Sequence, residues 1–237
     1  MMPDNYFVKQ IVVIAGGKGT RLYPLTKSVP KSLVLINKTP FIMHQIQLFK
    51  KNNISEVVLC LGIFQEKIRD FLDNQKKIDL NIKYSFENST KLLGTLGALK
   101  NASSLLDKEF FLIYGDSYLD TDYQKIYQTF SKSNKLGLMT VYKNKGKLIP
   151  SNVSIKDGMV VDYDKSNSKK FEYIDYGLSI FKKTALDYFP NDTTLDLHEL
   201  IKKLISLNQL TSYQVAERFY EIGSFEGIKD LEFYLRD

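Results

Sequence analysis

The sequence predicts an α/β fold in which helices flank a Rossmann-like, mainly parallel sheet, with a small antiparallel subdomain in the second half of the chain. In the first half, short apolar runs alternate with amphipathic helical segments, as in strand–helix–strand units with right-handed crossovers. In the second half, two strand-like runs flank Asp157-Gly158, a strong signal for a two-residue hairpin turn. With 237 residues, 43% of them hydrophobic, the chain can bury a sizeable core.

The individual elements follow from hydrophobic periodicity and from end signals such as Pro40, which starts a helix. We expect strands over residues 11–15, 57–61, 82–86, 110–114, 136–142, 152–156, 159–164 and 173–181. We expect helices from residue 40, over 65–73, from residue 94, and over 122–133, 196–206 and 226–235. No linker rich in Gly, Ser or Pro divides the chain, so we expect a single domain over residues 1–237, with halves 1–142 and 143–237.

Composition and charge narrow the classes of protein that the chain fits. It carries 33 lysines and arginines against 27 acidic residues, but no run of five basic residues, which favours a solvated surface over nucleic-acid binding. No apolar run approaches the roughly 20 residues that cross a bilayer, and the N-terminus lacks a signal-peptide pattern. The single cysteine, Cys60, permits no internal disulfide. We expect a cytoplasmic protein without nucleic-acid or membrane partners.

A glycine-rich loop follows directly on the first apolar strand. Gly16, Gly17 and Gly19 place backbone N–H groups where an anion could sit, and two cations, Arg21 and Lys31, follow within a short reach. A proline precedes Lys31, so we expect that segment to cross the site as a loop and not as a helix. The alternative is a tight strand-to-helix turn surrounded by solvated charges.

The loop fits neither of the two common nucleotide-binding patterns. A Walker A loop requires Ser or Thr after its lysine, but Gly19 follows Lys18. The dinucleotide fingerprint requires a third glycine where this chain has Leu22. The pattern G-G-x-G-T-R-L-x-P-L-T, followed by P-K, instead resembles the signature of the sugar-1-phosphate nucleotidylyltransferases. The resemblance extends from Ile11 to the last helix and implies the nucleotide-diphospho-sugar transferase fold, with nucleotide binding in 1–142 and sugar binding in 143–237.

The resemblance also implies where the nucleotide binds and which residues act in catalysis. The implied nucleotide-binding residues are Ala15, Gly16, Gly17, Gly19, Thr20, Arg21, Glu87, Gly94 and Thr95. The implied catalytic residues are Arg21, Lys31 and Asp116, with Arg21 gripping the leaving phosphates and Lys31 neutralising the α-phosphate. Taken alone, Gly94 and Gly97 fit helix-start geometry better than base binding, and an acid after a strand is most often a turn or cap residue.

The metal and sugar sites implied by the family depart in places from its pattern. Asp116 and Glu221 are the implied Mg²⁺ ligands, although Glu221 replaces the aspartate of the family's Trp-x-Asp-x-Gly-Thr segment. The implied sugar-phosphate residues are Asn152, Asp164, Lys165, Asp175 and Gly177. Asp164-Lys165 stands where the family has Glu-Lys-Pro, and a lysine or backbone amide is an alternative partner for Asp175. Both histidines, His44 and His198, lack a ligand pattern and are interpreted as structural.

The reaction that the resemblance implies is attack of a sugar 1-phosphate on a nucleoside triphosphate, with release of pyrophosphate. The ending Arg218–Ser224 looks most like that of heptose 1-phosphate guanylyltransferases, which suggests GTP with a heptose or mannose 1-phosphate, for surface polysaccharide synthesis. Uridylyl or cytidylyl transfer to another phosphate, or a non-catalytic nucleotide-sugar regulator, are the alternatives. The expected partners are the triphosphate and the sugar phosphate, and a homodimer is compatible with the sequence.

Overall fold

A computed structural model describes residues 7–144, 150–164, 171–191 and 194–236, and most of the strands in this part of the chain form one nine-stranded mixed sheet. Across the sheet the strands are β5 (Asn81–Phe86), β4 (Glu56–Leu61), β1 (Gln10–Ile14), β6 (Glu109–Tyr114), β11 (Tyr173–Lys182), β8 (Gly137–Lys143), β12 (Leu210–Val215), β10 (Met159–Tyr163) and β9 (Val153–Lys156). Two small two-stranded sheets lie outside it: the β2–β3 hairpin (Leu35–Ile36 with Thr39–Pro40), and the antiparallel pair of β7 (Ser117–Tyr118) with β13 (Tyr220–Glu221), which comes from a distant part of the chain.

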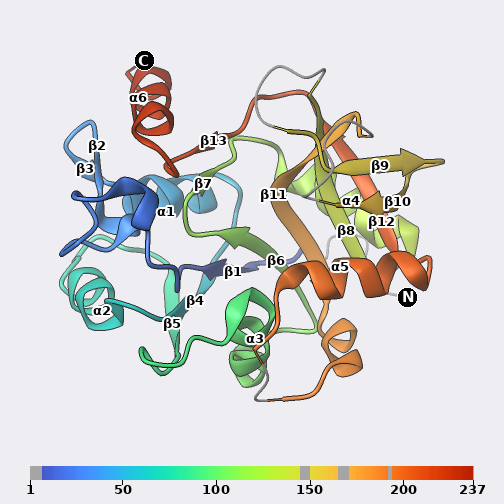
Figure 1. Cartoon of the computed structure of the whole chain (residues 1–237), viewed down its shortest axis with the longest axis horizontal. Coiled ribbons are helices and arrows are strands. Elements are labelled where there is room, and N and C mark those ends of the chain that lie inside the picture. The colour runs from blue at the N-terminus through green and yellow to red at the C-terminus, as the bar shows by residue number, and fades with distance from the viewer. Residues whose placement is uncertain (1–6, 145–149, 165–170, 192–193, 237) are drawn as a thin grey trace.

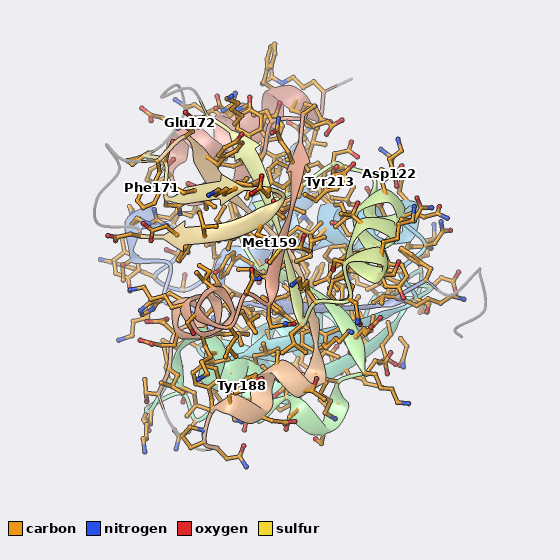
Figure 2. All side chains as sticks on the ribbon, turned by 90° about the vertical axis from the view of Figure 1, so that its right-hand side faces the viewer. Asp122, Met159, Phe171, Glu172, Tyr188 and Tyr213 are labelled. Carbon is orange, nitrogen blue, oxygen red and sulfur yellow. The ribbon has the colours of Figure 1, made fainter. Side chains whose placement is uncertain are left out.

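The sheet is parallel in its first half and mostly antiparallel in its second. Neighbours among β5, β4, β1 and β6 are all parallel, as the strand–helix rhythm predicted. Strand β11 is antiparallel to both β6 and β8, and the β9–β10 hairpin forms the far end, which Figure 2 views with Met159 on β10 and Tyr213 on β12 labelled. Strand β9 also pairs with β11 through Val153 and Tyr173, which closes this end of the sheet on itself.

Helices cover both faces of the sheet because its central strands are apolar on both sides. Along β1, Ile11 and Val13 pack with α1 (Phe41–Lys51), α2 (Gln65–Asp73) and α4 (Tyr123–Ser133), whereas Val12 packs with α3 (Gly94–Asn101) and α5 (Leu197–Ser206). Figure 1 shows this arrangement. Within the described residues, no helix combines the length and the apolar character that crossing a bilayer would need.

A third core lies beside the sheet and joins the two ends of the chain. Leu22 and Ile36 from the N-terminal region pack with Ile222 and with Leu231 of α6 (Phe225–Tyr234). Helix α6 therefore lies above the β2–β3 hairpin, far in sequence from the residues that it covers (Figure 1). This packing fixes the segment that carries Glu221 against the loop that follows β1.

Two features differ from the sequence prediction. Lys31–Leu33 forms a single 3₁₀ turn where the sequence predicted a loop without helix, because Pro30 is itself extended and the turn begins only after it. The prediction also missed β12, because its residues Leu210–Val215 show no regular alternation of apolar and polar side chains. Its place in the sheet is set by parallel pairing with β8, a contact between distant parts of the chain.

Substitutions at buried positions of the sheet should lower the free energy of unfolding much more than substitutions at exposed positions. Phe111 on β6 is fully buried, with its ring 5.2 Å from that of Tyr123, so Phe111→Ala should lower the free energy of unfolding by about 3–5 kcal/mol. Val161→Ala on β10, where the side chain is exposed, should change it by less than about 0.5 kcal/mol. Urea denaturation of both variants measures the difference, and equal losses would contradict this description of the core.

Candidate functional site

The site lies where β1 and β6 end side by side. The Gly115 N–H donates to the Ile14 carbonyl at 2.9 Å, and the Ala15 N–H donates to the Cys60 carbonyl at 2.9 Å. The glycine loop after β1 and the turn that carries Asp116 after β6 therefore meet at the same edge of the sheet, as expected for the carboxyl ends of parallel strands.

A cleft of about 310 Å³ opens between these loops. Its lining residues are Ile14, Ala15, Gly17, Lys18, Gly19, Thr20, Arg21, Pro30, Lys31, Ser32, Ile63, Thr95, Tyr114, Gly115, Asp116 and Gly223. The structure thus brings Arg21, Lys31 and Asp116 to one cleft and adds Lys18, which the sequence prediction did not include among site residues. Its backbone amides and three cationic side chains suit a polyanionic ligand.

An ion pair joins the two loops across the cleft. Lys31 Nζ lies 2.6 Å from Asp116 Oδ2, and the two side chains are only 17% and 27% exposed. Removing one partner of a partly buried pair leaves the other charge uncompensated, so each residue constrains where the other lies. The cation and the acid that the sequence pattern singled out are therefore in direct contact.

A buried glutamine on α1 holds the turn that carries Asp116. Gln45 Nε2 donates to the carbonyl oxygens of Tyr114, at 3.2 Å, and Ser117, at 2.8 Å, which flank Gly115 and Asp116. Gln45 is 1% exposed, and burying an amide is costly unless it finds such partners. The sequence contained one signal for it, a polar residue next to Ile46 on the apolar face of α1.

The glycine loop is held by the threonine that closes its motif. Thr26 Oγ1 donates to the Gly19 carbonyl at 2.7 Å, and Thr26 is 1% exposed. Gly19 has a φ of +64°, in the left-handed region that favours glycine. The sequence pattern included Thr26 without assigning it a role, and the structure shows that it fixes the loop's shape.

Glu87 lies behind the loops and does not line the cleft. Its Oε2 accepts the Leu93 N–H at 2.7 Å, and a Cβ added at Gly16 would lie 2.8 Å from its Oε1, so Gly16 leaves room for the carboxyl group. The side chain is almost fully buried, and this burial raises the pKa of Glu87 although the Leu93 N–H opposes the shift. Glu87 joins the glycine loop to the segment that leads into α3.

The start of α3 is bonded to the start of α5. Gly94 has a φ of +74°, and a Cβ there would lie 2.5 Å from the Leu195 carbonyl oxygen, so the helix-start interpretation accounts for this glycine. The Thr95 hydroxyl lines the cleft, but it also accepts the Leu197 N–H at 2.7 Å and lies 3.2 Å from Asp196 Oδ1. Two segments about 100 residues apart are therefore hydrogen-bonded to each other beside the cleft, and of these bonded residues Thr95 lines it.

A second cavity, of about 390 Å³, opens on the other side of Asp116. Its lining residues are Tyr114, Asp116, Ser117, Pro150, Asn152, Ile174, Asp175, Tyr176, Gly177, Phe219 and Glu221. Pairing of β7 with β13 places Glu221 opposite Ser117, and the Ile222 N–H donates to the Asp116 carbonyl at 2.9 Å. Asp116 thus lines both cavities, and Glu221 reaches only the second.

Three of the predicted sugar-phosphate residues form one hydrogen-bonded group in this second cavity. The Asp175 N–H donates to Asn152 Oδ1 at 2.9 Å, and the Gly177 N–H donates to Asp175 Oδ1 at 3.0 Å. The register between β11 and β8 shifts between Asp175 and Ser179, and Gly177 has a φ of +92° within this irregularity. A backbone amide is therefore one partner of Asp175, as the alternative interpretation allowed, and the acid also lines the cavity.

The remaining predicted residues are dispersed. Asp164 lines a third cavity, of about 360 Å³, between β10 and α5, and Lys165 lies outside the described residues. His44 has the structural role expected of it, since its Nε2 lies 3.0 Å from the Ile36 carbonyl oxygen. His198, also interpreted as structural, has its Nε2 3.1 Å from Glu199 Oε1 and also lines the third cavity.

The carboxylates available in the second cavity fit a hard divalent cation. Asp116 directly precedes β7, which pairs with the strand β13 that carries Glu221, and both acids line the same space. Among the described residues, no group of three or more His, Cys, Asp or Glu side chains is arranged to hold a metal by itself. Mg²⁺ usually takes one or two carboxylates together with phosphate oxygens, so this donor set suits Mg²⁺ bound with a phosphorylated ligand.

Because the carboxyl group of Glu87 is buried, we expect the stability of the fold to depend on pH. Because its pKa is raised above 4.5 in the folded state, Glu87 stabilises the fold at pH values below 4.5 relative to higher pH, and this contribution is lost as the pH rises through the raised pKa. Glu87→Gln removes the titration and keeps an oxygen for the Leu93 N–H. We expect the stability of wild type relative to Glu87→Gln, measured by urea denaturation, to fall as the pH rises above 4.5, and a pH-independent difference would contradict the shift.

Comparison with known proteins finds relatives that are named as guanylyltransferases. A mannose-1-phosphate guanyltransferase of Gibberella zeae is 31% identical over 229 residues, which cover 90% of this chain but only 60% of that protein. A D-glycero-alpha-D-manno-heptose 1-phosphate guanylyltransferase of Campylobacter jejuni is 28% identical over 215 residues, which cover 90% of this chain and 94% of that protein.

Solved structures share the fold. HddC from Yersinia pseudotuberculosis superimposes with a TM-score of 0.79 at 22% identity, covering 97% of this chain and 100% of that one. A putative glucose-1-phosphate thymidylyltransferase from Bacillus anthracis gives a TM-score of 0.84 at 17% identity, covering 96% and 95%. The model of the nucleotidyl transferase family matches residues 10–233, and this chain belongs to that family.

Proposed function

We propose that the protein transfers a nucleotidyl group from a nucleoside triphosphate to a sugar 1-phosphate. The observation that carries this assignment is the shared position of Asp116. It lines a cleft that also holds Arg21 and Lys31, and it lines a second cavity that also holds Asn152 and Glu221. Two phosphorylated reactants held in these spaces would meet at Asp116.

The transfer makes one bond and breaks one bond. An oxygen of the sugar 1-phosphate bonds to the α-phosphorus of the triphosphate, while the bond from that phosphorus to the bridging oxygen breaks and pyrophosphate leaves with the electron pair. The nucleophile is already an anion, so no side chain has to remove a proton from it. Catalysis then consists mainly of alignment and of charge stabilisation.

Three cationic groups in the cleft suit these tasks. The Arg21 guanidinium can bind the leaving pyrophosphate with two parallel hydrogen bonds, and Lys18 lies on the same loop. Lys31, held at 2.6 Å from Asp116, is placed to neutralise charge that grows on the α-phosphate. The amides of Gly17 and Gly19 add fixed dipoles that need no reorganisation during the reaction.

Asp116 and Glu221 would hold Mg²⁺, which neutralises phosphate charge and orients the two reactants when it is bound. The longer side chain of Glu221 lies close to Arg21, since a Cβ at Gly223 would be 3.3 Å from Glu221 Oε1 and 3.2 Å from Arg21 Nη2. These two residues come from opposite ends of the chain.

The two halves of the chain would divide the substrates between them. We assign the triphosphate to the cleft formed mostly by residues 1–142, and the sugar phosphate to the cavity formed mostly by residues 143–237. Each half also contributes to the other half's cavity, because Gly223 lines the first space and Asp116 lines the second.

For the substrate pair we propose GTP with a heptose or mannose 1-phosphate. Support comes from the relatives in Campylobacter jejuni and Gibberella zeae, whose names specify guanylyl transfer to these two sugar phosphates. We place the reaction in the cytoplasm, where nucleoside triphosphates are made, and its product in surface polysaccharide synthesis.

A panel assay tests the function and its alternatives. The protein is incubated with Mg²⁺, each of the four ribonucleoside triphosphates and a set of sugar 1-phosphates, and pyrophosphate release is measured. Release with GTP and a manno-configured sugar phosphate supports the assignment. Pyrophosphate release with UTP or CTP instead would show that the proposed substrate pair is wrong. Binding of a nucleotide sugar, without pyrophosphate release from any pair, would identify a non-catalytic regulator.

Substitutions in the cleft test the residue roles. Arg21→Ala and Lys31→Ala should each lower kcat on the order of 10²–10³-fold, because each removes a charge that stabilises the transition state. Lys27→Ala is the matched control, since Lys27 is an exposed cation on the same loop that does not line the cleft. Circular dichroism should show all three variants folded. Near wild-type turnover in Arg21→Ala or Lys31→Ala would remove that residue from the mechanism.

A further inference from the structure

A third cavity continues from the two that the reaction would use. Its volume is about 360 Å³, and the polar and aromatic groups on its walls are Tyr114, Tyr163, Asp164, Asp196, His198 and Lys202. Tyr114 lines all three cavities, and Thr95 lines both the first and the third. A ligand lying against Tyr114 can therefore extend from Asp116 into the third cavity.

Hydrogen bonds between distant segments hold the walls of this third cavity in place. The bonds of Thr95 to the Leu197 N–H and to Asp196 hold the first turn of α5 in place. His198 and Lys202 are four residues apart on that helix, so they project from the same face. On the opposite wall, the Tyr163 hydroxyl lies 3.5 Å from Asp175 Oδ2, which links this wall to the second cavity.

The chemistry of the walls favours a neutral, hydroxyl-rich group. Among the described wall residues, the two carboxylates of Asp164 and Asp196 outnumber the single ammonium, of Lys202, so these walls offer an anionic ligand no net attraction. The same side chains provide both hydrogen-bond acceptors and donors, which a polyol can satisfy together. Tyr114 and Tyr163 add aromatic surface for the C–H groups between the hydroxyls.

We propose that the third cavity binds a hydroxylated side chain extending beyond the ring of the sugar 1-phosphate, so that the enzyme prefers a sugar longer than a hexose. This inference rests on the proposed function and deepens it. The sugar ring would lie against Tyr114 with its phosphate toward Asp116, and its far end would reach His198 and Lys202. These two residues determine specificity, and neither contacts the reacting phosphates.

Mannose 1-phosphate and D-glycero-α-D-manno-heptose 1-phosphate test this, because the heptose differs by one additional hydroxylated carbon. With GTP and Mg²⁺, the wild type should show a higher kcat/KM for the heptose. His198→Ala and Lys202→Met should each lower kcat/KM for the heptose about tenfold, the loss expected for one hydrogen bond, while kcat/KM for mannose 1-phosphate stays within about twofold. Lys203→Met is the control, because Lys203 Nζ instead lies 5.3 Å from the ring of Tyr188, which is labelled in Figure 2.

Equal losses with both sugars, no loss with either, or a wild type that favours mannose 1-phosphate would overturn the inference. Equilibrium binding of the two sugar phosphates, followed by titration calorimetry, separates it from the proposed function. If the wild type binds the heptose 1-phosphate more tightly than mannose 1-phosphate, and Lys202→Met abolishes the difference, the cavity assignment holds even where no triphosphate supports turnover. His198 and Lys202 lie at the surface, so their replacement should not unfold the protein.

Discussion

The contact between Lys31 and Asp116 is the constraint on which the site depends. It spans 85 residues of sequence and joins the turn after Pro30 to the turn after β6 at a distance of 2.6 Å. With the cleft open, each charge neutralises the other where little water reaches them. Phosphate oxygens and a divalent cation could replace both partners at once, because one reactant brings the anion that Lys31 needs and the metal takes the carboxylate. The pair thus keeps the site assembled before the reactants bind.

The ends of the chain complete this arrangement. Arg21 and Glu221 both reach toward Gly223, and the third core packs Leu22 with Ile222 and α6. Helix α6 is further fixed by Tyr234, whose ring stacks on Tyr220 at 4.5 Å next to Glu221. The hydrophobic packing of helix α6 therefore positions the Glu221 carboxylate in the second cavity, and it brings residues 200 positions apart in sequence to neighbouring places in the fold.

The sequence was informative where the determining interactions are local. The strand β1, its glycine loop and Asp116 after β6 were predicted because apolar runs, glycines and a strand-end acid lie within a few residues of each other. Gln45, β12 and the third cavity were not, because each depends on contacts between distant segments: a helix with the turn after β6, β12 with β8, and α5 with β10. For the same reason, the sequence predicted Thr95 as a site residue but not its hydrogen bonds, which join its hydroxyl to residues about 100 positions away.

A crystal structure with an unreactive GTP analogue and Mg²⁺ would test the role of this ion pair most directly. If Lys31 and Asp116 hold the site together until the reactants take their place, the distance from Lys31 Nζ to Asp116 Oδ2 should increase from 2.6 Å to beyond the roughly 4 Å limit of an ion pair, with Lys31 against the α-phosphate. A nucleotide bound in the cleft with the ion pair still closed would contradict that role.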